Sequence, residues 1–331
     1  MRRAGAGAAV LALTLGAGCV GPPPHVLTYG DLDGWAQADH GAVAEVLAAQ
    51  CAATDLALPC PPERAGRAFW EAAFEPVLLP GADAALLTGY FEPVLPASPV
   101  RTARFHVPLH GLPAGAGEGP GPTRDAIANG ALEGRAAVLY WLDDPVEAFF
   151  LHIQGSGRLR LPDGREVRVG YAGRNGHPYT SIGRVLVERG EMAVEDVTAE
   201  SLRAWLRADP ARGRALMNEN ASYIYFREVS TLAPGEGPVG ALGLALTPGI
   251  SAALDPTVYP PGSPVWIAAD GPDGPIRRLA LAQDTGSAIR GPGRADLFIG
   301  TGAEAGRIAG RLSAPARIVL LRPRGAAEPA S

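Results

Sequence analysis

Short apolar segments separated by loops rich in glycine and proline make up residues 221–331 of the chain. Three of them, "SPVWIAAD", "IRRLALAQD" and "ARIVLLRP", have the length and the composition of strands. The 43 glycines and 32 prolines among the 331 residues favour turns and short strands over long helices. Because many short strands joined by irregular loops are typical of a small barrel, we expect a mainly β protein with a barrel near its carboxyl end.

The front and the middle of the chain are expected to add helices. Apolar residues recur at helical spacing in "LDGWAQADHGAVAEVLAAQCAA" and in "PERAGRAFWEAAF". By contrast, "VEAFFLHIQGSG" is predicted to be a strand, and "RLRLPDGREVRV" alternates about a Pro-Asp-Gly turn, as a hairpin does. The long Gly/Pro loop at residues 111–126 is a candidate crossing point between two domains.

The beginning of the chain, "MRRAGAGAAVLALTLGAGC", has the pattern of an export signal. Two arginines precede a short apolar core, and small residues lead up to Cys19. The ending "GAGC" resembles a bacterial lipoprotein box, which would make Cys19 the lipidated residue, and simple secretion is the alternative. We therefore expect a periplasmic protein held by a lipid anchor at Cys19, and Val20 after it is compatible with the outer membrane.

Export would place the chain in an oxidising compartment. Cys51 and Cys60 are then a natural disulfide pair, and two unpaired buried thiols are the alternative. The sequence has no C-x-x-C motif, and His177 has no partner at metal-ligand spacing, so we expect no metal site.

The basic residues exclude several classes of protein. The chain has no lysine, and all 29 of its basic residues are arginines. A GK[ST] phosphate loop, a Schiff-base lysine and a Ser-x-x-Lys hydrolase are therefore impossible. The net charge of −5 argues against nucleic acid as a partner, and nothing in the sequence indicates a cofactor.

Two acids stand at the ends of a glycine-rich segment between two predicted strands, in "LAQDTGSAIRGPGRADLFIGTG". Asp284 ends the first strand and Asp296 opens the second, so both carboxylates can reach one cleft if the strands lie side by side. Two carboxylates in different environments are what acid–base cleavage of a glycosidic bond requires. The alternative is that both residues cap turns, as Asp often does. A third acid, Asp255 in "LDPTVYPPG", is predicted from its prolines to be a turn residue.

Several longer blocks resemble one family. Asp255-Pro256, then "AQDTG" with "AIRG", then Asp296 before an apolar strand, are similar to the three-aspartate barrel domain of the membrane-bound lytic transglycosylase A family. Further blocks follow that family's order, over about residues 80–325: "LTGYFEPVLPAS", "FFLHIQGSGRLRLPDG", "VGYAGRNGHPYTSIGRVL", "MNENASYIYFRE" and "GALGLALTPG".

The resemblance implies a fold. It is a six-stranded double-psi β-barrel interrupted by an inserted second β-rich domain, with a deep groove between the two and helices at the amino end. On this basis we expect a signal at residues 1–19, N-terminal helices and the first part of the barrel at 20–105, the inserted domain at 106–220, and the rest of the barrel at 221–331.

The resemblance also implies an activity. The family cleaves the β-1,4 bond between N-acetylmuramic acid and N-acetylglucosamine in peptidoglycan without water, and leaves a 1,6-anhydro ring. Asp296 matches the catalytic acid, which afterwards acts as the base, Asp284 would orient and polarise it, and Asp255 would support the site. The implied partners are peptidoglycan glycan strands and, through Cys19, a membrane, and we expect a monomer.

Other polar and aromatic residues are candidates for binding the glycan. Gln154 and Ser156 in "HIQGSG" could bind sugar amides or hydroxyls, although a simple β-turn is equally compatible. Thr285 and Gly286 follow Asp284 directly. Sugar-stacking rings are the third kind of candidate, although aromatic residues in strands more often belong to the core; they are Tyr90, Tyr223 and Tyr225.

Two other functions compete with the transglycosylase reading. A hydrolytic glycosidase on the same barrel would use Asp296 as the acid and Asp284 to activate a water. A non-catalytic glycan-binding barrel would bind the same strands and release nothing.

Overall fold

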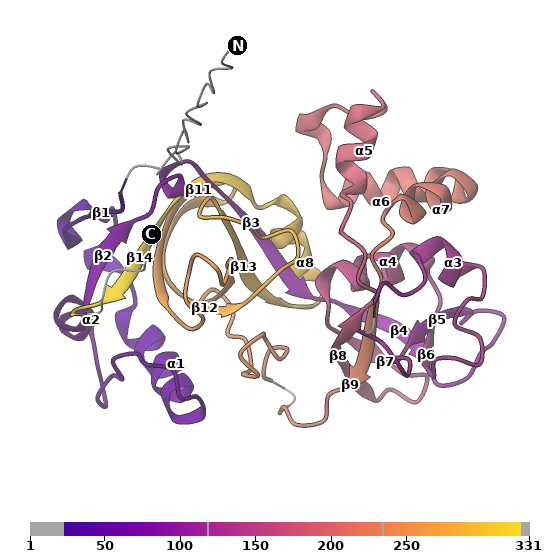
Figure 1. Cartoon of the computed structure of the whole chain (residues 1–331), viewed down its shortest axis with the longest axis horizontal. Helices are drawn as coiled ribbons and strands as arrows, with labels where there is room; N and C mark the ends of the chain where they lie inside the picture. The colour runs from indigo at the N-terminus through magenta and orange to yellow at the C-terminus, as the bar shows by residue number, and fades with distance from the viewer. Residues whose placement is uncertain (1–22, 118, 234, 326–331) are drawn as a thin grey trace, which may run out of the picture.

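Six strands form a closed barrel in the computed structural model, which describes residues 23–325 except 118 and 234 (Figure 1). Around the barrel the order is β14-β11-β12-β10-β13-β3, and β3 pairs back with β14 to close it. The pairs β10–β12 and β13–β3 are parallel and the others are antiparallel. The strand bounds are β3 Ala85–Glu92, β10 Ser251–Ala253, β11 Pro264–Gly271, β12 Gly274–Asp284, β13 Arg294–Thr301 and β14 Ser313–Pro323.

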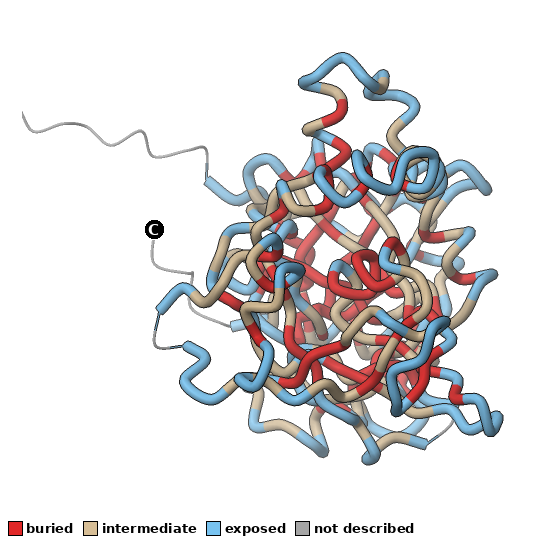
Figure 2. The backbone as a smooth tube through the Cα atoms, turned by 90° about the vertical axis from the view of Figure 1, so that its right-hand side faces the viewer, coloured by how far each residue is buried: buried red, intermediate tan, exposed pale blue. Residues whose placement is uncertain are grey.

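The alternation of side chains along the strands separates the inside of the barrel from its outside. On β12, Ala280 and Ala282 point into the barrel core, while Leu279 and Leu281 point outward into a second apolar cluster. Small and branched residues together fill the narrow interior of the barrel. This barrel core includes Leu87, Ala252, Val265, Ile267, Ala295, Leu297 and Ile318. Figure 2 shows that buried residues gather at the centre of the molecule, with exposed loops around them.

The N-terminal helices cover the outer apolar side of the barrel. Helix α1 (His40–Ala53) begins at Asp39, whose carboxylate accepts a hydrogen bond from the backbone N–H of Ala42. It buries Val43, Leu47 and other residues of one face against β11 and β12. Helix α2 (Arg67–Ala73) adds a fully buried tryptophan, and β1 (His25–Val26) and β2 (Phe74–Leu78) extend the sheet beyond β14.

A second unit is inserted between β3 and β10. Its sheet has the order β5-β6-β4-β7-β8-β9, and it carries most of the helices (Figure 1). The strands are β4 Val94–Ser98, β5 Val107–His110, β6 Val138–Leu142, β7 Gly157–Arg160, β8 Glu166–Arg174 and β9 Ile224–Glu228. The helices are α3 Arg124–Ala128, α4 Pro145–Gln154, α5 Ile182–Glu188, α6 Ala199–Ala208 and α7 Pro210–Glu219, while α8 (Gly302–Arg311) belongs to the barrel side.

The observed architecture matches the expected mainly β fold with a closed six-stranded barrel and a second sheet. The double-psi form of the barrel connections stays a prediction, and so do the domain limits at residues 105 and 220. The strands change sheet between Glu92 and Val94, and the chain rejoins the barrel at Ser251.

Two local predictions were wrong. Residues 145–154 form helix α4 instead of a strand, because Asp144 caps its first N–H groups, Pro145 occupies its first position and Gly155 ends it in the left-handed conformation. The Gly/Pro loop at residues 111–126 joins β5 to α3 inside the second unit, so it is not the crossing point between the units. The hairpin prediction was correct, since Gly157–Arg160 pairs with β8 in antiparallel register.

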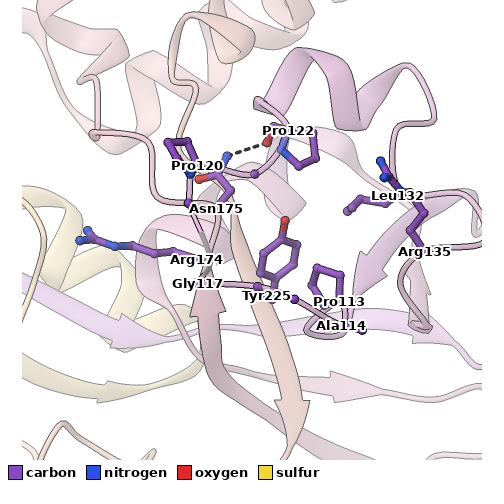
Figure 3. Close-up of a pocket in the computed structure, with 14 residues that line it drawn as sticks. Pro113, Ala114, Gly117, Pro120, Pro122, Leu132, Arg135, Arg174, Asn175 and Tyr225 are labelled. Atoms are coloured by element: carbon purple, nitrogen blue, oxygen red, sulfur yellow. Dashed lines mark hydrogen bonds between the residues drawn. The ribbon is translucent and has the colours of Figure 1, made fainter.

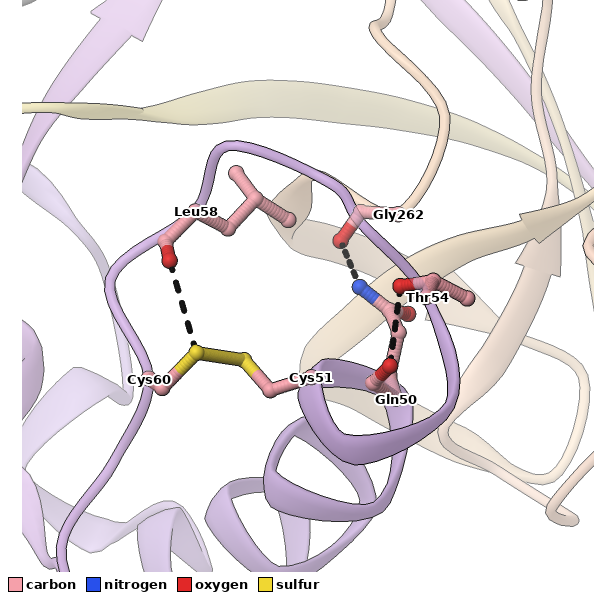
Figure 4. The surroundings of a disulfide bond; sticks show 6 residues. All are labelled: Gln50, Cys51, Thr54, Leu58, Cys60 and Gly262. Atoms are coloured by element: carbon pink, nitrogen blue, oxygen red, sulfur yellow. Dashed lines mark hydrogen bonds between the residues drawn. A yellow bond between two sulfur atoms is a disulfide. The ribbon is translucent and has the colours of Figure 1, made fainter.

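The structure joins Cys51 and Cys60 in a disulfide bond at the end of α1 (Figure 4). The neighbouring Gln50 is buried and donates a hydrogen bond of 3.0 Å to the carbonyl of Gly262, in the loop before β11. The disulfide therefore closes the loop that leads away from the helix at the point where the helix is tied to the barrel. Cys19 lies outside the described residues.

Replacing both Cys51 and Cys60 by Ser should lower the free energy of unfolding by about 2–3 kcal/mol, because the bond closes a loop across a sequence separation of 9 residues in the unfolded chain. Urea unfolding of the variant and of the oxidised wild type measures the difference. Reduced wild-type protein is the control and should resemble the variant. Equal midpoints for all three samples would contradict the prediction.

Candidate active site

Four residues from four neighbouring barrel strands lie in one row across the sheet. Ala253 of β10 is paired with Asp284 of β12 on one side and with Asp296 of β13 on the other, and Asp296 is paired with Thr88 of β3. Since adjacent strands lie about 4.8 Å apart, the backbones of the two acids are roughly 10 Å apart. The alanine between them leaves space for both carboxylates.

Strand β3 shows that both acids serve the same outer face of the barrel. Thr88 and Tyr90 are two residues apart, so their side chains leave the strand on one side. The Thr88 hydroxyl donates to Asp296 Oδ1 at 2.9 Å, and the Tyr90 hydroxyl donates to Asp284 Oδ2 at 2.8 Å. The structure thus brings together the two acids that the sequence placed at the ends of a glycine-rich segment.

Asp296 has the electrostatics of a proton donor. Burial disfavours its charged form and, together with the nearby carboxylate of Asp284, raises the pKa of its carboxyl to about 7. The hydrogen bond from Thr88 and the charge of Arg294 act in the opposite direction. Arg294 also donates to the Thr88 hydroxyl at 3.3 Å, which orients that hydroxyl. Asp296 therefore exchanges its proton near neutral pH.

Asp284 is held more strongly in its charged form. Burial raises the pKa of its carboxyl above the usual value, but hydrogen bonds from Tyr90 and from the backbone N–H groups of Thr285 and Ala241 lower it. The Ala241 N–H lies 3.0 Å from Oδ1. Burial and the charge of Asp284 raise the pKa of Tyr90, so this phenol stays protonated and remains a donor. One acid of the pair thus has several donors, and the other has one hydroxyl.

Asp255 supports the loop between the two acids. It is only 4% exposed, and it accepts hydrogen bonds from the N–H of Gly291 at 2.7 Å and from both the N–H and the hydroxyl of Thr257. The bond from Gly291, followed by that from the Thr257 hydroxyl, lowers the pKa of its carboxyl, so Asp255 is ionised. Tyr259 donates to the carbonyl of Pro292 at 2.7 Å and fixes the same loop a second time.

The other predicted site residues have different positions. Thr285 is exposed beside Asp284, and both line a small cavity of about 80 Å³; Gly286 follows in the turn, packed against Ile289. Gln154 ends α4, and its Oε1 accepts a hydrogen bond of 3.1 Å from the backbone N–H of Phe91 on β3. Ser156 is half-buried in the turn after α4.

The prediction that the rings of Tyr223 and Tyr225 stack on sugar does not fit the structure. Both belong to a buried cluster of the second unit, in which Tyr225 of β9 and Tyr223, just before that strand, pack with Leu132. The Tyr223 hydroxyl is 2.8 Å from His110 Nδ1, and its ring packs on His152. Tyr225 lines a pocket of about 260 Å³ under the Gly/Pro loop, with its hydroxyl toward that loop (Figure 3).

Several contributors to the site were missed in the sequence. Thr88 and the backbone of Ala241 hold the two carboxylates, and only the alternation in "TGYFE" hinted that Thr88 shares a face with Tyr90. Below the site, Gln283 accepts from the Ser251 hydroxyl at 2.6 Å and donates to Gln50 Oε1 at 3.0 Å. This buried chain fixes the end of β12, where Asp284 lies.

No group of three or more His, Cys, Asp or Glu side chains within residues 23–325, leaving out 118 and 234, is arranged to hold a metal ion. In the same part of the chain, none of the helices combines the length and the apolar character needed to cross a bilayer. The candidate site consists of side chains, backbone N–H groups and two coupled carboxyl groups.

Comparison with known protein families gives two matches. Residues 86–227 match the MltA specific insert domain, and residues 250–322 match the 3D domain. Membrane-bound lytic murein transglycosylase A of Vibrio cholerae is 35% identical over 234 residues, which are 68% of this chain and 62% of that protein. The protein of the same name from Escherichia coli K12 is 34% identical over 246 residues, 71% of this chain and 65% of its own. The match thus spans slightly less than two thirds of these relatives.

Solved structures match over more of the chain. A membrane-bound lytic murein transglycosylase from Agrobacterium tumefaciens superposes with a TM-score of 0.81 at 30% identity, covering 91% of this chain and 98% of that one. MltA from Neisseria gonorrhoeae gives 0.76 at 32% identity over 91% and 93%. Escherichia coli MltA with bound chitohexaose gives 0.68 at 29% over 78% and 79%. With both domains matched and the fold shared, this chain belongs to the membrane-bound lytic murein transglycosylase A family.

Proposed function

We propose that the protein is a lytic transglycosylase that cleaves the β-1,4 bond between N-acetylmuramic acid and N-acetylglucosamine in peptidoglycan. The observation that carries the proposal is the carboxyl of Asp296, with a pKa of about 7, beside the carboxyl of Asp284, which accepts more hydrogen bonds. Such a pair of acids with different pKa values is the arrangement used for cleaving glycosidic bonds. The names of the relatives agree, and one related structure contains chitohexaose.

The reaction needs two proton transfers, both through the carboxyl group of Asp296. Protonated Asp296 donates to the glycosidic oxygen as the bond from that oxygen to the muramic acid C1 breaks, and the N-acetylglucosamine leaves as an alcohol. Ionised Asp284 stabilises the positive charge that develops at C1. The 6-hydroxyl of the muramic acid then attacks C1 and gives its proton to the Asp296 carboxylate, which returns to its first state.

No water is required, because the nucleophile belongs to the sugar itself. An intramolecular hydroxyl has a high effective concentration, so the enzyme needs to hold only the ring and the proton donor in place. The loop fixed by Asp255 and the row from Asp284 to Thr88 provide a rigid base for this geometry. Thr285, exposed next to Asp284, is positioned to contact the glycan.

We also propose that the protein works in the periplasm, anchored by a lipid at Cys19 in the outer membrane and acting as a monomer. The export pattern before Cys19, the disulfide between Cys51 and Cys60, and the membrane-bound relatives support this location. The lipid would keep the barrel close to the cell wall, where its substrate is.

Digestion of purified peptidoglycan tests the activity directly. Wild-type protein should release fragments whose ends are one water lighter than hydrolytic ends, as read by mass spectrometry. Asp296→Asn should bind sacculi but release product at least about 10²–10⁴-fold more slowly, since it has no proton to donate. Asp284→Asn should lose much of the activity but not all of it.

The matched control for this digestion is Asp270→Asn, which changes an exposed acid on β11 and should leave the rate unchanged. Products of full mass would indicate a hydrolase. Binding with no release by the wild type would indicate a glycan-binding barrel. Normal release by Asp296→Asn would refute the assignment of the acid.

The pH dependence of kcat/KM should report both acids. The rate should fall as pH rises through about 7, because Asp296 then loses the proton that it must donate. Tyr90→Phe removes a donor that lowers the pKa of Asp284, so the acidic limb should move to higher pH. An unchanged acidic limb in Tyr90→Phe, or a rate that is level across neutral pH, would count against these roles.

Asp296 should also make the protein less stable as pH rises. The pKa of Asp296 is about 7 in the folded state and lower in the unfolded chain, so between about pH 4 and 7 the folded state keeps a proton that the unfolded state has lost. The free energy of unfolding therefore falls as pH rises through this range. Asp296→Asn does not titrate and should be more stable than wild type by up to roughly 4 kcal/mol at about pH 8, with no gain near pH 4. Urea unfolding at the two pH values measures this, and a gain independent of pH would contradict the raised pKa.

A further inference from the structure

Strand β3 carries a third polar residue on the face that holds the two acids. Thr88 bonds Asp296, Tyr90 bonds Asp284, and Glu92, two residues further on, is completely buried where the barrel meets the second unit. At about 3.3 Å per residue, Glu92 lies roughly 13 Å along the strand from Thr88. One strand thus connects the acids to the junction between the units, and it is seen passing from one to the other in Figure 1.

Two arginines of the second unit surround the Glu92 carboxylate. Arg158 of β7 donates from Nε to Oε2 at 2.8 Å, and Arg168 of β8 has its Nε 2.9 Å from Oε1. These two arginines face each other across the β7–β8 pair, and their side chains are 16% and 8% exposed. On the barrel side, the hydroxyl of Thr301 at the end of β13 donates to Oε2 at 2.8 Å.

The same arginines also hold the chain on its way back to the barrel. Arg158 and Arg168 both donate to the carbonyl of Glu236, at 2.9 and 2.6 Å. Glu236 lies in the segment that leads from β9 to β10. Glu92 itself is the last residue of β3, just before the chain passes into β4, so both covalent connections between the units meet at this cluster.

Burial of such a cluster is poorly explained by stability alone. Removing charges from water costs about as much as their attraction returns, and apolar replacements of similar shape are often neutral or stabilising. An apolar cluster does not fix the orientation of the groups that it joins. Hydrogen bonds and ion pairs do, because they depend on angles as well as distances, whereas dispersion contacts do not.

We propose that Glu92, with Arg158 and Arg168, is a positioning cluster that sets the angle of the second unit to the barrel and so determines how well long glycan strands bind beside Asp296. A strand that lies across the acids reaches the second unit within a few sugar rings. Because the angle is already fixed, binding does not have to order the two units. The affinity for long strands is therefore higher. The proposal rests on the proposed function for its substrate and concerns the same site.

The test separates an effect on the angle between the units from an effect on the stability of the fold. The triple variant Glu92→Leu, Arg158→Met and Arg168→Met keeps the volume of the cluster and removes every charge. It should unfold cooperatively at a temperature close to that of the wild type, while the KM for long, uncrosslinked glycan strands rises about tenfold and kcat stays within about twofold. A wild-type KM, or a loss of kcat at unchanged KM, overturns the proposal.

A second readout does not depend on activity. Small-angle X-ray scattering should give a broader distribution of interatomic distances in the triple variant than in the wild type. Identical curves would contradict the proposal that the cluster fixes the angle between the units. If the wild type releases no fragments, the proposed function fails. The scattering result still decides whether the cluster fixes the angle between the units. If the triple variant does not fold, Arg168→Met alone should show a smaller rise in KM, and an unchanged KM overturns the proposal.

The matched control is the double variant Glu75→Gln and Arg322→Met. It removes a partly buried ion pair, with side chains 22% and 16% exposed, between β2 and β14 on the side of the barrel away from the second unit. This control should leave both KM and the scattering curve unchanged. An equal rise in KM in the control would show a general effect of lost ion pairs.

Discussion

The pairing of β3 with both β13 and β14 is the interaction on which the remaining features depend. It closes the barrel, and it places Thr88 opposite Asp296 in register. Because the face of β3 is then fixed, Tyr90 reaches Asp284 from the same strand. A shift of one residue in this pairing would turn both hydroxyls into the apolar interior and leave the two carboxylates without their donors.

Two acids of one type acquire different properties from their surroundings. Asp284 accepts hydrogen bonds from a phenol and two backbone N–H groups, which favour its charged form, while Asp296 accepts one from a hydroxyl. The charge of Asp284 also raises the pKa of Asp296, so the proton resides on Asp296. Asp255, which accepts three hydrogen bonds, is ionised and acts on the loop instead.

The sequence predicted the local features well where a local signal exists. Alternation found the strands that end at Asp284 and begin near Asp296, and the block order pointed to the family. The helix α4 was mistaken for a strand because its aromatic and apolar composition outweighed the capping residues Asp144, Pro145 and Gly155. Nothing local shows that Tyr223 is buried, since burial depends on which elements later cover it. The partnership of Thr88 and Asp296 joins residues 208 positions apart, beyond the reach of any pattern in a short window.

The insertion between β3 and β10 has a consequence for how the molecule is assembled. The second unit is continuous in the chain, so its contacts can form while the last barrel strands are still unpaired. The barrel, in contrast, has to wait for β13 and β14, because β3 finds its partners only after a very long loop has closed. Until that moment β3 has two open edges, so ring closure competes during folding with self-association of an incomplete sheet.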